Sequence, residues 1–207
     1  MTGERSTWLV PLWVSVFAVV LLWSVIRPHD YPTWALEVAP AIIAALVLAA
    51  TRRRFPLTPL LYWLILIHCI ILMIGGHYTY AEVPVFNWLR DSFGLARNNY
   101  DKLGHFAQGF VPAMVARELF LRLQVINGRL WLNALIVCVC LAISAVYEII
   151  EWLVAVISAE AAEAFLGTQG YVWDTQSDMA WAGTGAVVAL AVLGRWHDRQ
   201  LRVLGRR

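Results

Sequence analysis

The chain has 207 residues, of which 60% are hydrophobic and only 14% are charged, and its mean hydropathy is +0.65. A water-soluble domain of this length needs more charge on its surface, so the composition excludes an ordinary soluble protein and is typical of a membrane protein. The formal net charge is only +2. We therefore expect the lipid bilayer as the main partner and no nucleic acid.

Six apolar stretches recur along the chain, each long enough, or nearly so, to cross about 30 Å of hydrocarbon as a helix. They cover residues 8–26, 34–50, 57–74, 104–123, 131–157 and 177–193. Pro40 and Pro112 lie inside two of them, and a membrane helix tolerates such prolines with a kink. The sequence predicts an all-α polytopic membrane protein, with a single domain over residues 1–207 and a bundle of about six transmembrane helices.

The longest connection, residues 75–103, joins the third and fourth predicted spans. Loops of this size usually carry function or are disordered. Aromatic residues and the central sequence FNWLRDSF, residues 86–93, favour an ordered loop with a short helix at the outer membrane interface.

Basic residues predict the orientation. If the amino terminus is cytoplasmic, the inner segments contain twelve Lys and Arg residues and the outer segments contain four. Cytoplasmic loops are enriched in basic residues, so both termini are predicted to be cytoplasmic and the 75–103 loop external.

Ionisable residues recur at helical spacing near the predicted outer ends of the spans. The fourth span begins with Asp101, His105 and Gln108, at intervals of four and three residues that place them on one helical face. Two further groups have the same kind of spacing: Ser144, Glu148 and Glu151 in the fifth span, and Asp174 and Asp178 at the start of the sixth. Glu37, His68 and His77 join them at the same level of the membrane.

Burying these groups is costly. A charged residue near the centre of a bilayer costs about 2.5–3.5 kcal/mol on insertion scales, so such residues usually face the bundle interior and mark a site. Clustered carboxylates repel each other unless protons or a cation neutralise them. Cys69, Cys138 and Cys140 lie inside spans without metal-ligand spacing and are interpreted as small buried residues. Carboxylate and imidazole ligands without thiolate suit Zn²⁺, Mn²⁺ or Mg²⁺ as a cofactor.

The candidate site residues fall into three sets. The candidate catalytic residues are Asp101, His105, Glu148, Glu151, Asp174 and Asp178. The candidate metal ligands are His105, Glu148, Glu151 and Asp178, with His77 as a further candidate. The candidate substrate-binding residues are Lys102, Tyr100, Arg97, Gln108, Gln169 and Gln176, which would hold a phosphate-bearing lipid headgroup.

Three interpretations of the polar cluster stay open at this point. The first is a metal-dependent enzyme that acts on an envelope lipid or lipid-linked substrate at the outer face. The second is a transporter or sensor coupled to protons or cations, for which a homodimer could supply the symmetry. The third is a buried polar network that only stabilises the fold; in it, Lys102 forms a structural ion pair.

Three motifs carry a resemblance to a known family. DKLGHFAQGF, YEIIEW and LGTQGYVWDTQSDM occur in this order within a short chain of six predicted spans, and together they resemble the YjdF-like family of uncharacterised bacterial inner-membrane proteins. The likeness covers nearly the whole chain and implies a multi-pass protein of the bacterial cytoplasmic membrane, but no reaction. A more distant similarity, in the DK, HF and later acidic pair, is to VanZ-like envelope proteins.

Overall fold

The computed structural model describes residues 4–157 and 168–205. In these residues the chain is helical and has no strand. The helices are α1 (Glu4–Val25), α2 (Tyr31–Thr51), α3 (Pro59–Tyr78), the 3-10 helix η1 (Tyr80–Glu82), α4 (Pro84–Phe93), α5 (Tyr100–Arg122), α6 (Arg129–Ile157) and α8 (Asp174–Leu204). Each predicted span falls on one long helix, so the all-α prediction is confirmed for this part of the chain.

Four of the helices, α2, α3, α6 and α8, are long and apolar enough to cross a membrane. The apolar part of α1 is shorter and covers Leu9–Val25. Helix α5 combines apolar residues with charged residues in both its first and its last turn. A helical membrane protein is therefore confirmed, whereas the number of six spans and the side of the termini stay predictions.

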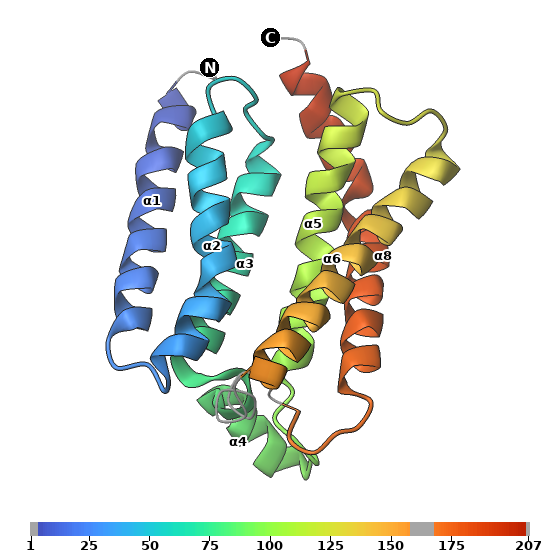
Figure 1. The fold of residues 1–207 in the computed structure, drawn as a ribbon. Helices are drawn as coiled ribbons and strands as arrows, with labels where there is room; N and C mark the ends of the chain where they lie inside the picture. The colour runs from blue at the N-terminus through green and yellow to red at the C-terminus, as the bar shows by residue number, and fades with distance from the viewer. Residues whose placement is uncertain (1–3, 158–167, 206–207) are drawn as a thin grey trace.

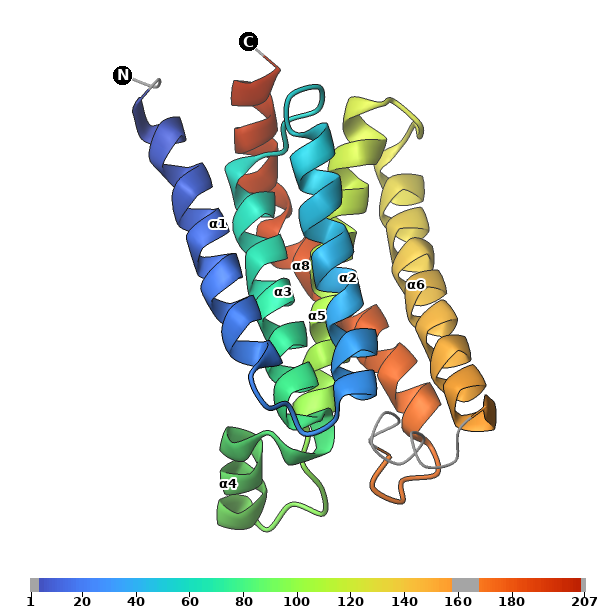
Figure 2. The same ribbon diagram turned by 60° about the vertical axis from the view of Figure 1, so that its left-hand side comes forward.

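The long helices form two groups of three (Figure 1). Helices α1, α2 and α3 pack together, as do α5, α6 and α8, and contacts between α3 and α5 join the groups. The start of α1 and the end of α8 lie at the same end of the bundle, and α4 lies beyond the opposite end (Figures 1 and 2). Helix α4 is the short helix that the sequence predicted around residues 86–93.

Large apolar side chains cover the outside of the bundle. Leu22, Leu46 and Ile149 are each more than half exposed, and many others on the outward faces are similar. Monomeric soluble proteins rarely expose apolar surface on this scale, whereas lipid chains solvate it without cost. Cys138 also faces outward, so the prediction that all three cysteines are buried is wrong for this one.

Helices α5 and α8 approach each other more closely than side chains allow. A Cβ atom added to Gly109 would lie 1.7 Å from the carbonyl oxygen of Ala182, and one added to Gly185 would lie 2.1 Å from that of Phe106. Small residues permit such backbone contact between membrane helices, where dispersion forces drive association.

A buried ion network joins three helices at the end of the bundle opposite α4. Glu118 of α5 is fully buried and accepts hydrogen bonds from the backbone N and the hydroxyl of Thr58, at 3.1 and 2.8 Å. His197 of α8 lies 2.9 Å from the same carboxylate, and Arg122 lies 2.8 Å from it. Because Thr58 is the N-cap residue of α3, this network fixes the ends of α3, α5 and α8 to one another.

Candidate functional site

Four helix ends bring acidic residues to the end of the bundle where α4 lies. The starts of α2, α5 and α8 and the last turns of α6 meet there (Figure 1). The acids that they carry are Glu37, Asp101, Glu148, Glu151, Asp174 and Asp178, and all six are buried. The helical spacing therefore identified the inward faces correctly. In α6, for example, Glu148 and Glu151 are buried while Ile149 and Ile150 between them are exposed.

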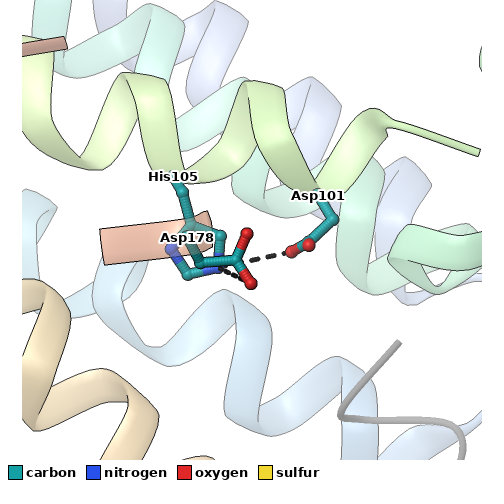
Figure 3. A group of neighbouring side chains, drawn as sticks. All are labelled: Asp101, His105 and Asp178. Atoms are coloured by element: carbon teal, nitrogen blue, oxygen red, sulfur yellow. Dashed lines mark ion pairs between the residues drawn. The ribbon is translucent and has the colours of Figure 1, made fainter. Parts of the chain in front are cut away.

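Three of the site residues form a compact triad, Asp101, His105 and Asp178. One ligand atom from each of them lies within 4.8 Å of the others (Figure 3). His105 Nε2 is 3.3 Å from Asp101 Oδ1 and 3.9 Å from Asp178 Oδ2. Two atoms that each lie about 2.0–2.2 Å from one Zn²⁺ ion are at most about 4.4 Å apart, so a small inward shift gives metal-ligand geometry.

Gln108 orients the imidazole ring of His105. The side-chain oxygen of Gln108 lies 3.2 Å from His105 Nδ1, one helical turn along α5. With Nδ1 as the donor, Nε2 presents a lone pair toward the two aspartates. A second hydrogen bond of this kind is the usual partner of a metal-ligating histidine. Gln108, expected to bind substrate, is thus a positioning residue for His105.

Two cations fix the aspartates from the other side. Lys102 Nζ lies 2.8 Å from Asp178 Oδ1, and Arg97 Nη2 lies 3.3 Å from Asp101 Oδ2. Each aspartate therefore has one oxygen held by a cation and the other directed at His105. Arg97 and Lys102 also both contact Asp174 Oδ1, so Asp174 supports the cations and stays outside the triad.

Glu148 has a carboxylate oxygen aimed at the triad. Its Oε1 lies 3.9 Å from His105 Nε2. This atom is buried and has no hydrogen-bond partner among residues 4–157 and 168–205. An ionised carboxylate left in this state is costly, because burial removes its water without replacing it. The centre thus receives oxygen atoms from α5, α6 and α8 around one imidazole nitrogen.

A second polar group adjoins the triad on the side of α2. Tyr147 of α6 donates a hydrogen bond of 2.9 Å to Glu37 Oε2. The ring of Tyr80 occupies space left by two glycines, since a Cβ on Gly75 or Gly104 would lie within 2.1 or 2.7 Å of it. Neither tyrosine was predicted as a site residue, although Tyr147 lies inside the motif YEIIEW and glycines flank the loop that carries Tyr80.

Two of the predicted substrate-binding residues secure the loop before α5. Tyr100 donates a hydrogen bond of 2.8 Å to the backbone oxygen of Ile71, and its ring packs against Tyr80 and Phe86. Gln169 accepts a hydrogen bond from the backbone N of Asn98 and donates one to its backbone oxygen, at 3.0 and 2.9 Å. These contacts hold the loop in place and so support Arg97 and Lys102.

Other predicted residues lie away from the triad or at its edge. His77 packs against Trp23, with their ring centroids 4.3 Å apart, and its Nδ1 lies 3.1 Å from the backbone oxygen of Ser24, so the structure does not bring it to the other candidate ligands. Gln176 is exposed in the first turn of α8. The compact triad includes Asp101, which the sequence had placed among the catalytic residues only, and it includes neither Glu148 nor Glu151.

Comparisons with known proteins bear on the whole chain. Residues 9–199 match the family described as "Predicted membrane protein (DUF2238)". The chain belongs to this family. It is 54% identical over 187 residues, which is 90% of each chain, to the protein named "Inner membrane protein YjdF" of Escherichia coli strain K12. No solved structure matches.

The family assignment confirms the YjdF-like resemblance and the location. The chain is an inner-membrane protein of a family whose description carries no reaction. The likeness to VanZ-like proteins stays a prediction, as do the roles of the site residues.

Proposed function

We propose that this protein is an inner-membrane enzyme with a divalent metal centre, acting by hydrolysis or group transfer on an envelope lipid or lipid-linked substrate. Asp101, His105 and Asp178 would hold the ion. The observation that supports this most strongly is the orientation of the side chains of these three residues. Each aspartate has one oxygen fixed by Arg97 or Lys102, and the other oxygen and His105 Nε2 face a common point.

The donor set fits such an ion. One imidazole nitrogen and two carboxylate oxygens suit Zn²⁺ or Mn²⁺, and Mg²⁺ would depend on the oxygens. A divalent ion held there would supply Lewis-acid chemistry toward a phosphoryl or carbonyl group of the substrate. Glu148 Oε1, 3.9 Å from His105 Nε2, is placed to act as a general base at this site.

We expect divalent metal to bind in a manner that requires Asp178. Calorimetric titration of the purified, metal-stripped protein with Zn²⁺ or Mn²⁺ should give about one site. Replacing Asp178 with Asn removes a charged ligand and should weaken binding at least about tenfold, the lower end of what even supporting residues of metal sites contribute.

The matched control is Asp91→Asn, which changes the same group on the exposed surface of α4, next to Arg90. It should bind metal as the parent does. Equal binding by all three proteins, or no binding by the parent, would reject the metal centre. In the second case, His105 with a protonated Nε2 would neutralise the aspartates, and a structural or proton-coupled network would be favoured instead.

The proposal includes six transmembrane helices with both termini in the cytoplasm. The first turn of α1 and the last turn of α8 lie at one end of the bundle, as an even number of spans requires. Twelve of the sixteen Lys and Arg residues belong to the segments of that end. The triad then lies in the outer half of the membrane.

Reporter fusions test this topology. Alkaline phosphatase, which is active only outside the cytoplasm, should be inactive when fused after Arg207. It should be active when fused near Val85, at the start of α4. The opposite pattern would place the triad on the cytoplasmic side and remove outer-leaflet lipids from the candidate substrates.

A further inference from the structure

A large cavity, open to the outside along part of its length, extends away from the triad between the helices. It has a volume of about 610 Å³ and lies between α2, α3, α5 and α6. Asp101 and His105 belong to its lining, so it is continuous with the candidate metal site. Its volume is within the usual range of small-molecule sites, about 300–1,000 Å³.

The lining changes character along the length of the cavity. At the end near the triad it contains Glu37, Tyr147 and Glu151, together with the triad's Asp101 and His105. Away from that end, apolar side chains from all four helices replace them, for example Ala44, Leu72, Val115 and Ile143. His68 is the main polar side chain part-way along, and its Nε2 has no hydrogen-bond partner in the described part of the chain.

The cavity is long as well as apolar. On α2 its lining begins at Glu37 and ends at Thr51, a separation of about 21 Å at 1.5 Å per residue. It continues to Phe55 and Leu119 near the opposite end of the bundle. The cavity thus runs along much of the apolar thickness of the protein, with its acidic groups at one end only.

Water is a poor occupant of this space. An ordered water needs about two to four polar partners, and the apolar part of the lining does not supply them. Aliphatic chains are the surrounding solvent of a membrane protein, and they need no hydrogen-bond partner.

We infer that this cavity holds one aliphatic chain of a phospholipid, with the headgroup at the triad. The inference rests on the proposed function and names its substrate class. The lipid lies parallel to the helices, with its chain directed from the triad toward Phe55 and Leu119. The cavity therefore binds the aliphatic chain of the lipid, and the triad contacts its headgroup.

The charge of the headgroup end adds a condition on binding. Among the described residues that line the cavity, none is Lys or Arg, whereas Glu37, Asp101 and Glu151 are acidic. A phosphate would meet repulsion there unless a divalent cation lies between it and the carboxylates. The chain should therefore bind with or without metal, whereas the phosphate should require it.

Photo-crosslinking of the full-length protein tests the position of the chain. The protein is reconstituted in vesicles of phosphatidylethanolamine and phosphatidylglycerol containing a small fraction of phosphatidylglycerol with a diazirine at the end of one acyl chain. After irradiation, labelled residues are mapped by mass spectrometry. Labels should occur on buried cavity residues such as Val111 and Leu48, in addition to the lipid-exposed faces.

A variant in which a large side chain obstructs the cavity shows whether the labels come from a chain inside it. Ala44→Trp places an indole in the cavity, where it obstructs the path of a chain along α2, and should lower labelling of cavity residues by about tenfold. Ala49→Trp is the control, because Ala49 lies on the exposed side of the same helix. It should leave cavity labelling unchanged. Both variants are compared with the parent only if they elute as monodisperse protein.

Two outcomes overturn the inference. Labels confined to exposed faces in the parent protein would show that no chain enters, and this result needs no variant. If Ala44→Trp leaves the labelling of cavity residues unchanged, these labels do not come from a chain inside the cavity.

Asp178→Asn separates this inference from the proposed function, since Asp178 lies outside the cavity lining. That variant should lose metal and keep its cavity labels, so failure of either claim is recognised independently of the other.

Discussion

Replacing Gly109 with alanine adds only one methyl group but should strongly destabilise the protein. The added Cβ would lie 1.7 Å from the backbone oxygen of Ala182, which no side-chain rotation relieves. Helices α5 and α8 would have to separate, and overpacking of this kind typically costs about 1–3 kcal/mol or more. Both helices carry triad residues, so metal binding should weaken as well. Thermal melting in detergent measures the loss.

Gly194→Ala is the matched control for this variant. Gly194 lies in α8 as well, and a Cβ added there meets no atom within 4 Å in the described structure. Alanine is favoured over glycine inside a helix by about 0.5–1 kcal/mol, so this variant should melt at the same or a slightly higher temperature. If Gly109→Ala and Gly194→Ala both melt at the same temperature as the parent, the backbones of α5 and α8 do not approach each other as closely as described.

Replacing Glu148 with glutamine should remove about half of the stabilisation that metal provides and leave the metal-free fold intact. Glu148 has no ion pair with Lys or Arg in the described residues, so the exchange leaves no basic side chain unpaired. A neutral amide is also cheaper to bury than an unpaired carboxylate. At a metal concentration of 100 Kd the parent gains about 2.7 kcal/mol from binding, and a tenfold weaker variant gains only about 1.4 kcal/mol.

Melting temperatures with metal and with chelator measure this difference. In chelator the parent and Glu148→Gln should melt at nearly the same temperature, whereas with metal the parent should melt at the higher temperature. Glu82→Gln is the control, since Glu82 is exposed in η1 beyond the bundle, and it should respond to chelator as the parent does. A Glu148→Gln protein that melts far below the parent, while chelator leaves the parent unchanged, would favour a structural network over a metal centre.

The sequence predicted the helices well because membrane spans are read from local composition. Every long helix coincides with an apolar stretch, and α4 was predicted from its aromatic sequence within the loop. The predicted ends of the helices were less accurate. Helix α8 continues to Leu204, beyond the predicted end at residue 193, because its basic last turns stay helical outside the apolar stretch.

The site could be predicted only as far as helical faces determine it. Spacing of four residues placed Asp101 with His105 and Asp174 with Asp178. Which of these aspartates completes the triad depends on the crossing of α5 and α8, and that crossing depends on Gly109 and Gly185. No pattern within one helix contains this information.

Partners that are far apart in the sequence were predicted least well. Tyr147 binds Glu37, a residue 110 positions away, and His197 lies against Glu118, 79 positions away. A lone histidine in a helix gives no sign of its partner on another helix. Tyr100 and Gln169 were assigned to substrate binding for the same reason, although they bind backbone groups.

X-ray absorption spectroscopy of the zinc-loaded protein tests the metal centre most directly, because it measures the ligands themselves. The account predicts one imidazole nitrogen and two or more oxygens at about 2.0–2.2 Å, with no sulfur ligand. In Asp178→Asn this spectrum should be lost, and in Asp91→Asn it should persist. Sulfur at about 2.3 Å would place the ion at a cysteine and contradict the account, as would an unchanged spectrum in Asp178→Asn.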